Sequence, residues 1–123
     1  MKIGKINTNK KVFIIAEIGN NHEGNFKLAK KMINAAATAG VDAVKFQTFL
    51  PEHFVSFEDQ SRLKRLRNFQ LSFKQFRELS KVAKEKGLIF FSTPLDIKSA
   101  KFLNSIQPIF KISSGDNNFY PLI

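Results

Sequence analysis

The stretch DAVKFQT, residues 42–48, decides the fold, because it is an apolar run that ends in polar side chains. Val44 and Phe46 predict a buried strand, and Lys45 lies between them. A lysine on a buried strand needs an anion or a carboxylate nearby to offset the cost of its desolvation. The alternative is an edge strand on which Lys45 faces water.

Three other apolar runs end in the same way. FIIA is followed by Glu17, LIFF is followed by Ser92 and Thr93, and FKISSG occupies residues 110–115. We interpret residues 109–112 of this last run as a short buried strand that is stopped by a glycine. FKISSG places a cation and two hydroxyls at a strand end, which suits an anionic ligand.

Helical patterns separate the four runs. The predicted helices cover residues 26–39 with Asn25 as N-cap, residues 72–86 with a Ser72 and Gln75 capping box, and residues 96–106 with Asp96 as N-cap. With strands starting near residues 12, 43, 88 and 109, the alternation predicts an α/β fold with a parallel sheet. The polar strand ends then share the carboxyl edge, where parallel α/β folds bind ligands.

Two further segments complete the predicted architecture. Residues 2–6 and 11–18 lean toward β structure around residues 7–10, which predicts an N-terminal hairpin. Residues 49–71 contain Pro51 and a basic, weakly periodic stretch, which predicts a long loop with a short helix beside a binding site. For the cations of this stretch, a solvated helix face is favoured over contact with a ligand.

Composition limits the function classes. At 123 residues and 43% hydrophobic content, we expect one globular domain spanning residues 1–123. The formal net charge of +10 comes mainly from lysines on predicted polar helix faces, so nucleic acid is not expected as a partner. The sequence has no cysteine, so no disulfide is expected. It has no apolar run approaching 18 residues and no signal peptide, so we expect a cytoplasmic protein that does not enter a membrane.

Two kinds of site find little support in the sequence. Neither GxGxxG nor GxxxxGK[ST] occurs, so a dinucleotide site or a phosphate-binding P-loop is not predicted. His22 and Glu23 are adjacent in one loop, and two such residues do not make a metal site without partners. A loop held by its own polar side chains is the favoured interpretation.

The motifs IIAEIGNNHEG, DAVKFQT, FFSTP and KISSGDNNFYPLI together resemble the N-terminal half of the sialic acid synthase family. These enzymes are phosphoenolpyruvate-dependent nonulosonate synthases. The resemblance covers residues 13–123 and implies the first half of a (β/α)8 TIM barrel, with about four parallel strands and three helices. It also implies that phosphoenolpyruvate condenses with N-acetylmannosamine or a related amino sugar and that phosphate is released.

The resemblance also implies roles for individual residues. Lys45, Thr93, Lys111 and Ser114 match family positions that hold phosphoenolpyruvate. Two separated ammonium groups and hydroxyl donors suit a ligand with a phosphate and a carboxylate. Glu17, Lys45 and Lys111 match catalytic positions of the family. Glu17 matches an active-site carboxylate that orients water or assists proton transfer. Asp116 stands where many members carry a glutamate that contacts the sugar, so the acceptor sugar is left open.

Other parts of the family pattern fall outside these residues. The resemblance implies a divalent metal, Mn or Mg, whose histidine ligands lie beyond Ile123, together with the second half of the barrel and an antifreeze-like domain. His22 and His53 do not match those ligands. A homodimer is expected for full-length members of the family. For these residues alone we expect little or no synthase turnover.

Three functions remain open from the sequence. The chain is a truncated N-terminal portion of a synthase, a non-catalytic half-barrel that binds an anion or assembles with a partner half, or part of another phosphoenolpyruvate aldolase on the same architecture.

Overall fold

The structure of the protein is a computed structural model that describes residues 2–3 and 6–123. Its strands are β1 (Lys2–Ile3), β2 (Ile6–Asn7), β3 (Ile15–Gly19), β4 (Ala43–Thr48) and β5 (Ile89–Pro94). Its helices are α1 (Phe26–Thr38), α2 (Pro51–Phe54), α3 (Gln60–Phe69), α4 (Phe73–Glu85), α5 (Ile97–Leu103) and the 3₁₀ turn η1 (Ser114–Asp116).

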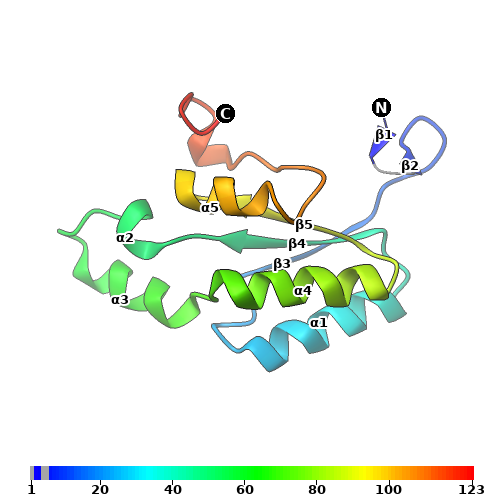
Figure 1. Ribbon diagram of the computed structural model, residues 1–123, viewed down its shortest axis with the longest axis horizontal. Helices are drawn as coiled ribbons and strands as arrows, with labels where there is room; N and C mark the ends of the chain where they lie inside the picture. The colour runs from blue at the N-terminus through cyan, green and yellow to red at the C-terminus, as the bar shows by residue number, and fades with distance from the viewer. Residues whose placement is uncertain (1, 4–5) are drawn as a thin grey trace.

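Three strands form a parallel sheet in the order β3-β4-β5, and α1 and α4 lie side by side against one of its faces (Figure 1). The register places Glu17 of β3 opposite Lys45 of β4, and Gln47 of β4 opposite Thr93 of β5. The predicted α/β class and parallel sheet are therefore confirmed. β4 is the central strand, which excludes the alternative of an edge strand for Lys45.

The main core lies between the sheet and this pair of helices. Phe46 of β4 stacks on Phe90 of β5, with ring centroids 5.6 Å apart, and meets Phe76 of α4 edge-on at 6.2 Å. Ile33 of α1 and Leu79 of α4 are fully buried in the same cluster. Because neighbouring side chains on a strand point to opposite faces, burying Phe46 here sends Lys45 and Gln47 to the other face.

The predicted helix starts are confirmed by their caps. Asn25 accepts a hydrogen bond from the Leu28 N–H, and Ser72 and Gln75 form a reciprocal capping box. Asp96 caps α5 and also accepts from the Leu50 N–H at 2.8 Å, which ties the end of β4 to the start of α5.

The excursion after β4 carries two helices, α2 and α3, over a small second core of Phe49, Val55, Leu63 and Leu66. Four cations of this excursion are exposed, as expected for a solvated helix face: Arg62, Lys64, Arg65 and Arg67. None of the described helices is long and apolar enough to cross a membrane.

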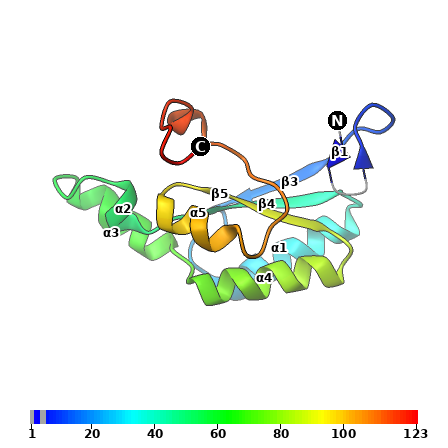
Figure 2. The same cartoon turned by 45° about the horizontal axis from the view of Figure 1, so that its top comes forward.

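The predicted fourth strand at residues 109–112 is wrong. These residues have no regular structure, and Phe110 is 42% exposed. The free edge of β5 is instead occupied by the side chain of Gln107, which accepts from the Ser92 N–H at 2.7 Å and donates to the Ser92 carbonyl at 3.1 Å. A side-chain amide thus takes the place that a neighbouring strand would have on this edge. The C-terminal segment then loops over α5 and ends on the opposite side from α1 and α4 (Figure 2).

The N-terminal prediction is also corrected. β1 pairs with β2, so Lys2 and Ile3 face residues 6–7 rather than residues 11–18, and residues 4–5 of the predicted strand lie outside the described residues. The first parallel strand begins at Ile15 rather than near residue 12. The Asp42 carboxylate accepts hydrogen bonds from the Ile14 N–H at 2.9 Å and from the Lys11 ammonium at 2.5 Å. The Ile14 N–H is therefore bound to a side chain, and strand pairing begins at the next residue.

We predict that Gly24→Ala destabilises the fold more than Gly87→Ala. Both glycines have a positive φ, so a Cβ costs about 1–2 kcal/mol at either position. At Gly24 the added Cβ would also lie 2.0 Å from the backbone oxygen of Asn68 at the end of α3, whereas at Gly87 no atom of the described residues lies within 4 Å. Overpacking against backbone adds about 1–3 kcal/mol at Gly24. Urea unfolding followed by circular dichroism measures both, and equal losses would contradict the prediction.

Candidate active site

A buried ammonium group forms the centre of the site. Lys45 projects from the central strand on the face away from α1 and α4, and its residue is 9% exposed. Its Nζ lies 2.8 Å from Oε2 of Glu17 on β3 and donates to Oγ1 of Thr93 on β5 at 3.2 Å. One residue from each strand of the sheet therefore meets at this point, and the predicted carboxylate beside Lys45 is present.

The two partners of Lys45 differ in their contact with solvent. Thr93 is 3% exposed, whereas the Glu17 side chain is 56% exposed. An ammonium has three N–H donors, and the described residues engage it through these two acceptors. A half-exposed carboxylate is screened by water and holds its partner weakly. The Glu17 side of the Lys45 ammonium therefore faces solvent, whereas the Thr93 side is buried.

An amide pair continues the site toward the carboxyl end of the sheet. Gln47 follows Lys45 on the same face of β4, and its Oε1 accepts from Nδ2 of Asn20 at 2.7 Å. Asn20 belongs to the loop that follows β3. Sequence reasoning counted Gln47 among the polar strand ends but gave it no role, although its spacing of two from Lys45 places both on one face. It missed Asn20.

The loop after β3 is held by a buried histidine. His22 is 1% exposed, its Nδ1 accepts from the Gly24 N–H at 3.1 Å, and its ring lies 6.0 Å from that of Phe46. This confirms a loop held by its own polar side chains. Burial lowers the pKa of His22 below its ordinary value of 6.5, because the imidazolium would lose its hydration. The neutral ring that accepts at Nδ1 carries its proton at Nε2.

The other predicted site residues lie on the C-terminal segment, and no hydrogen bond or ion pair among the described residues joins them to Lys45. Lys111 is exposed, and its ammonium donates to the carbonyl oxygen of Ile112 next to it. Ser113 caps η1 by accepting from the Gly115 N–H at 3.3 Å, and Ser114 and Asp116 belong to that turn. The structure brings Glu17, Lys45 and Thr93 together and leaves Lys111, Ser114 and Asp116 on a separate segment.

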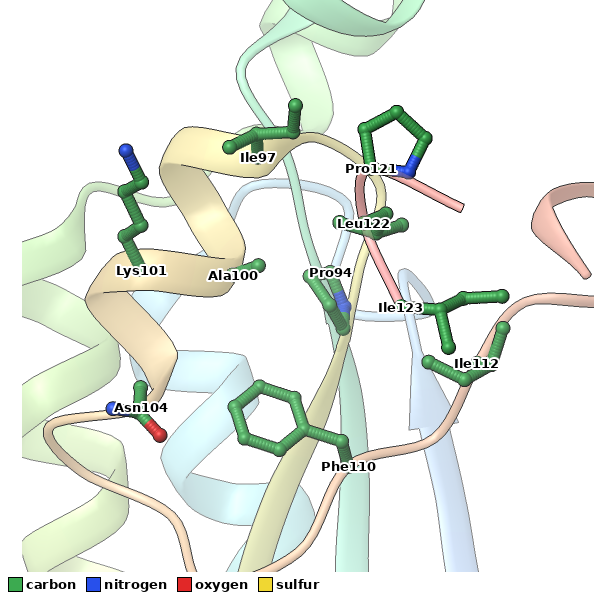
Figure 3. A pocket seen from close by; sticks show the side chains of 10 residues that line it. All are labelled: Pro94, Ile97, Ala100, Lys101, Asn104, Phe110, Ile112, Pro121, Leu122 and Ile123. Atoms are coloured by element: carbon green, nitrogen blue, oxygen red, sulfur yellow. The ribbon is translucent and has the colours of Figure 1, made fainter. Parts of the chain in front are cut away.

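An apolar cleft of about 370 Å³ separates this segment from α5 (Figure 3). Phe110 points toward α5 in this cleft, and Leu122 and Ile123 close it from the other side near Pro94. Neither Lys45 nor Lys111 lines the cleft. Its apolar lining does not suit an anion, so the cleft is distinct from the site around Lys45.

The described residues do not fit a metal site. Within residues 2–3 and 6–123, no group of three or more His, Cys, Asp or Glu side chains could hold an ion. The Nδ1 of His22 is already engaged by Gly24, and His53 is exposed on α2.

Comparison with known proteins settles the family. Residues 32–123 match the NeuB family. The chain belongs to the NeuB family. Its resemblance to sialic acid synthases, predicted from four motifs, is thereby confirmed.

Relatives of this NeuB chain include synthases of several sugar acids. The N,N'-diacetyllegionaminic acid synthase of Campylobacter jejuni is 38% identical over 93% of the chain and 38% of its own length. The N-acetylneuraminate-9-phosphate synthase of Homo sapiens is 35% identical over 90% of the chain and 34% of its own length.

A solved structure agrees with the fold. The N-acetylneuraminic acid synthetase of Leptospira borgpetersenii, in complex with citrate, superimposes with a TM-score of 0.92 and 34% identity, over 99% of this chain and 44% of that one. The α/β units described here therefore share the fold of part of that TIM-barrel synthetase. The chain spans less than half the length of each of these relatives.

We predict that His22 makes the stability of this chain depend on pH below about 6.5. Because the pKa of His22 is lowered in the folded state, the unfolded state takes up the proton first as the pH falls. The free energy of unfolding is therefore constant above about pH 6.5 and decreases below it, by at most about 1.4 kcal/mol per pH unit. Urea unfolding at a series of pH values measures this slope.

Two variants control this measurement. His22→Gln removes the titrating ring, so the slope that begins below about pH 6.5 should disappear, whereas His53→Gln changes the exposed histidine and should leave that slope in place. A slope that survives in His22→Gln would show that another group causes it.

Proposed function

We propose that this chain carries the phosphoenolpyruvate-binding part of a nonulosonate synthase active site. The observation that carries the proposal is the buried Lys45 ammonium, with an exposed carboxylate and a buried hydroxyl as its partners. It is supported by membership of the NeuB family and by relatives that are synthases of sialic and legionaminic acids. The Leptospira relative was solved with citrate, which is itself a small polyanion.

In this proposal the groups around Lys45 bind and orient the substrate. Lys45 replaces its contact with Glu17 by one to the carboxylate or phosphate of phosphoenolpyruvate, and charge-assisted hydrogen bonds of this kind are strong when shielded from water. Thr93 provides a hydroxyl to the same anion. Glu17, released from Lys45, accepts a proton or orients water beside the reacting carbon.

The reaction proposed for the complete site forms one carbon–carbon bond. The methylene carbon of phosphoenolpyruvate attacks the open-chain aldehyde of N-acetylmannosamine or a related amino sugar. Water adds to the adjacent carbon, and phosphate leaves. The divalent metal implied by the family would activate the aldehyde, but the described residues provide no ligand set for it, so no step on this chain is routed through a metal.

Lys111 and Ser114 are proposed to bind the second anionic group of phosphoenolpyruvate, and Asp116 to contact the sugar. For this, residues 109–115 have to lie along the free edge of β5. In the structure that edge is held by Gln107 at both backbone groups of Ser92. The proposal therefore requires the Gln107 contacts to be exchanged for strand pairing.

We predict that Lys45→Met weakens binding of phosphoenolpyruvate to this chain. Loss of a charged hydrogen bond of about 1.5–3 kcal/mol raises the dissociation constant about tenfold to hundredfold. Isothermal titration calorimetry with phosphoenolpyruvate measures the change. Lys84→Met is the matched control, because Lys84 is an exposed lysine of α4 on the far side of the sheet. Equal affinity in the two variants would remove the physical basis of the proposed function.

A second candidate function is a half-barrel that assembles with a complementary half. It is favoured by exposed apolar side chains before β3 and on the C-terminal segment: Val12 (77%), Ile14 (51%), Phe110 (42%) and Ile123 (65%). Both outer strands of the parallel sheet also have a free edge in the described part of the chain, apart from the Gln107 contacts on β5. Exposed apolar surface and open strand edges favour association.

We predict that the chain associates with itself as its concentration rises. Size-exclusion chromatography with light scattering should show a molar mass above the 14.0 kDa of one chain, and Val12→Lys with Ile14→Lys should lower it. Lys27→Glu and Lys31→Glu on the exposed face of α1 are the control changes. A constant monomer mass across concentrations would count against assembly.

A further inference from the structure

The orientation of the Gln47 amide bears on the chemistry of the site around Lys45, because strand alternation places both side chains on one face of β4. A glutamine amide has an accepting oxygen at one end and a donating NH₂ group at the other. Gln47 is half-buried on the same strand face as Lys45 and opposite Thr93 in the register. If its oxygen faced the pocket, it would accept from the ammonium and compete with an incoming anion.

In the structure, the oxygen end of the Gln47 amide is hydrogen-bonded to Asn20 rather than to Lys45. The Oε1 of Gln47 accepts from Nδ2 of Asn20 at 2.7 Å, in a partly buried contact. The Nε2 of Gln47 has no hydrogen-bond partner among the described residues, and it is not one of the enclosed polar atoms that lack a partner. This NH₂ group is therefore unpaired among the described residues and not fully enclosed.

Asn20 can hold Gln47 in this way because its loop is rigid. The Glu23 N–H donates to the Asn20 carbonyl at 2.9 Å, and the Asn21 N–H donates to the Ile18 carbonyl at 3.0 Å. Gly24 closes the loop against the backbone of Asn68, where no Cβ would fit. The rest of the loop is anchored by the buried His22.

We propose that Asn20 is a positioning residue, which engages the Gln47 oxygen so that the Lys45 pocket presents donors to an anion. Lys45, Thr93 and the Gln47 NH₂ group then all offer hydrogens on one side of the site. The half-exposed carboxylate of Glu17 is the acceptor that an anion displaces. The effect on anion binding rests on the proposed function, whereas the contact between Asn20 and Gln47 does not.

The isosteric variant Asn20→Asp tests the geometry directly. A carboxylate at position 20 cannot donate, so the Gln47 amide should turn, donate its NH₂ group to the new carboxylate and aim its oxygen at Lys45. The side-chain NH₂ resonances of the ¹⁵N-labelled chain report this without any ligand. In the natural chain we expect slow hydrogen exchange at the Asn20 NH₂ group and fast exchange at that of Gln47. In Asn20→Asp the Gln47 NH₂ group should exchange about tenfold more slowly than in the natural chain.

The control is Asn21→Asp, which adds the same charge to the same loop at an exposed position. It should leave the Gln47 NH₂ exchange unchanged. Slow exchange at the Gln47 NH₂ group in the natural chain, or no slowing in Asn20→Asp, would overturn the positioning role. Both outcomes are read from a folded spectrum, so unfolding of a variant is recognised separately, and the relative exchange rates of the Asn20 and Gln47 NH₂ groups in the natural chain then decide the geometry by themselves.

Phosphoenolpyruvate titration tests the consequence. Asn20→Asp should weaken binding about threefold to tenfold more than Asn21→Asp, because an oxygen now competes for Lys45. In a Gln47→Leu background, which removes the amide, Asn20→Asp and Asn21→Asp should weaken binding equally. An equal effect of both variants with Gln47 present would overturn the inference. Failure of the natural chain to bind phosphoenolpyruvate would instead overturn the proposed function, while the exchange measurement still decides the role of Asn20.

Discussion

The contact of the Lys45 ammonium with Glu17 and Thr93 is the interaction on which the site depends. A buried ammonium is costly unless charged and polar partners surround it. Here the partners come from the two neighbouring strands, so the parallel register itself supplies them. Because one partner is half-exposed, the arrangement stabilises the lysine in the free protein and still leaves it within reach of an anion.

The packing on the opposite face of the sheet makes this arrangement possible. Phe46 and Phe90 are buried against Phe76 and the helix pair, and strand alternation then commits Lys45 and Gln47 to the other face. A shift of one residue in β4 would exchange the two sets and place an ammonium in the apolar core. The aromatic core therefore sets the register that the site requires.

The C-terminal segment shows where reasoning from sequence failed. FKISSG has the composition of a strand end, yet residues 109–112 remain irregular while Gln107 occupies the edge of β5. Local propensity for β structure forms a strand only when a partner edge is available. An amide side chain that satisfies both backbone groups of Ser92 competes for that edge, and no periodicity in the sequence reveals such a contact.

The sequence by itself determined the alternation of strands and helices and the caps at Asn25, Ser72 and Asp96, because these follow from local patterns of residues. It also determined that Lys45 needs an anionic partner, because burying an unpaired charge is costly. It also carried the motifs that place the chain in its family. Only the tertiary structure decided that Glu17 is the carboxylate, that Asn20 engages Gln47 and that Lys111 lies apart from Lys45. Those contacts join residues from different elements, and their geometry depends on strand register and loop packing, which no local pattern encodes.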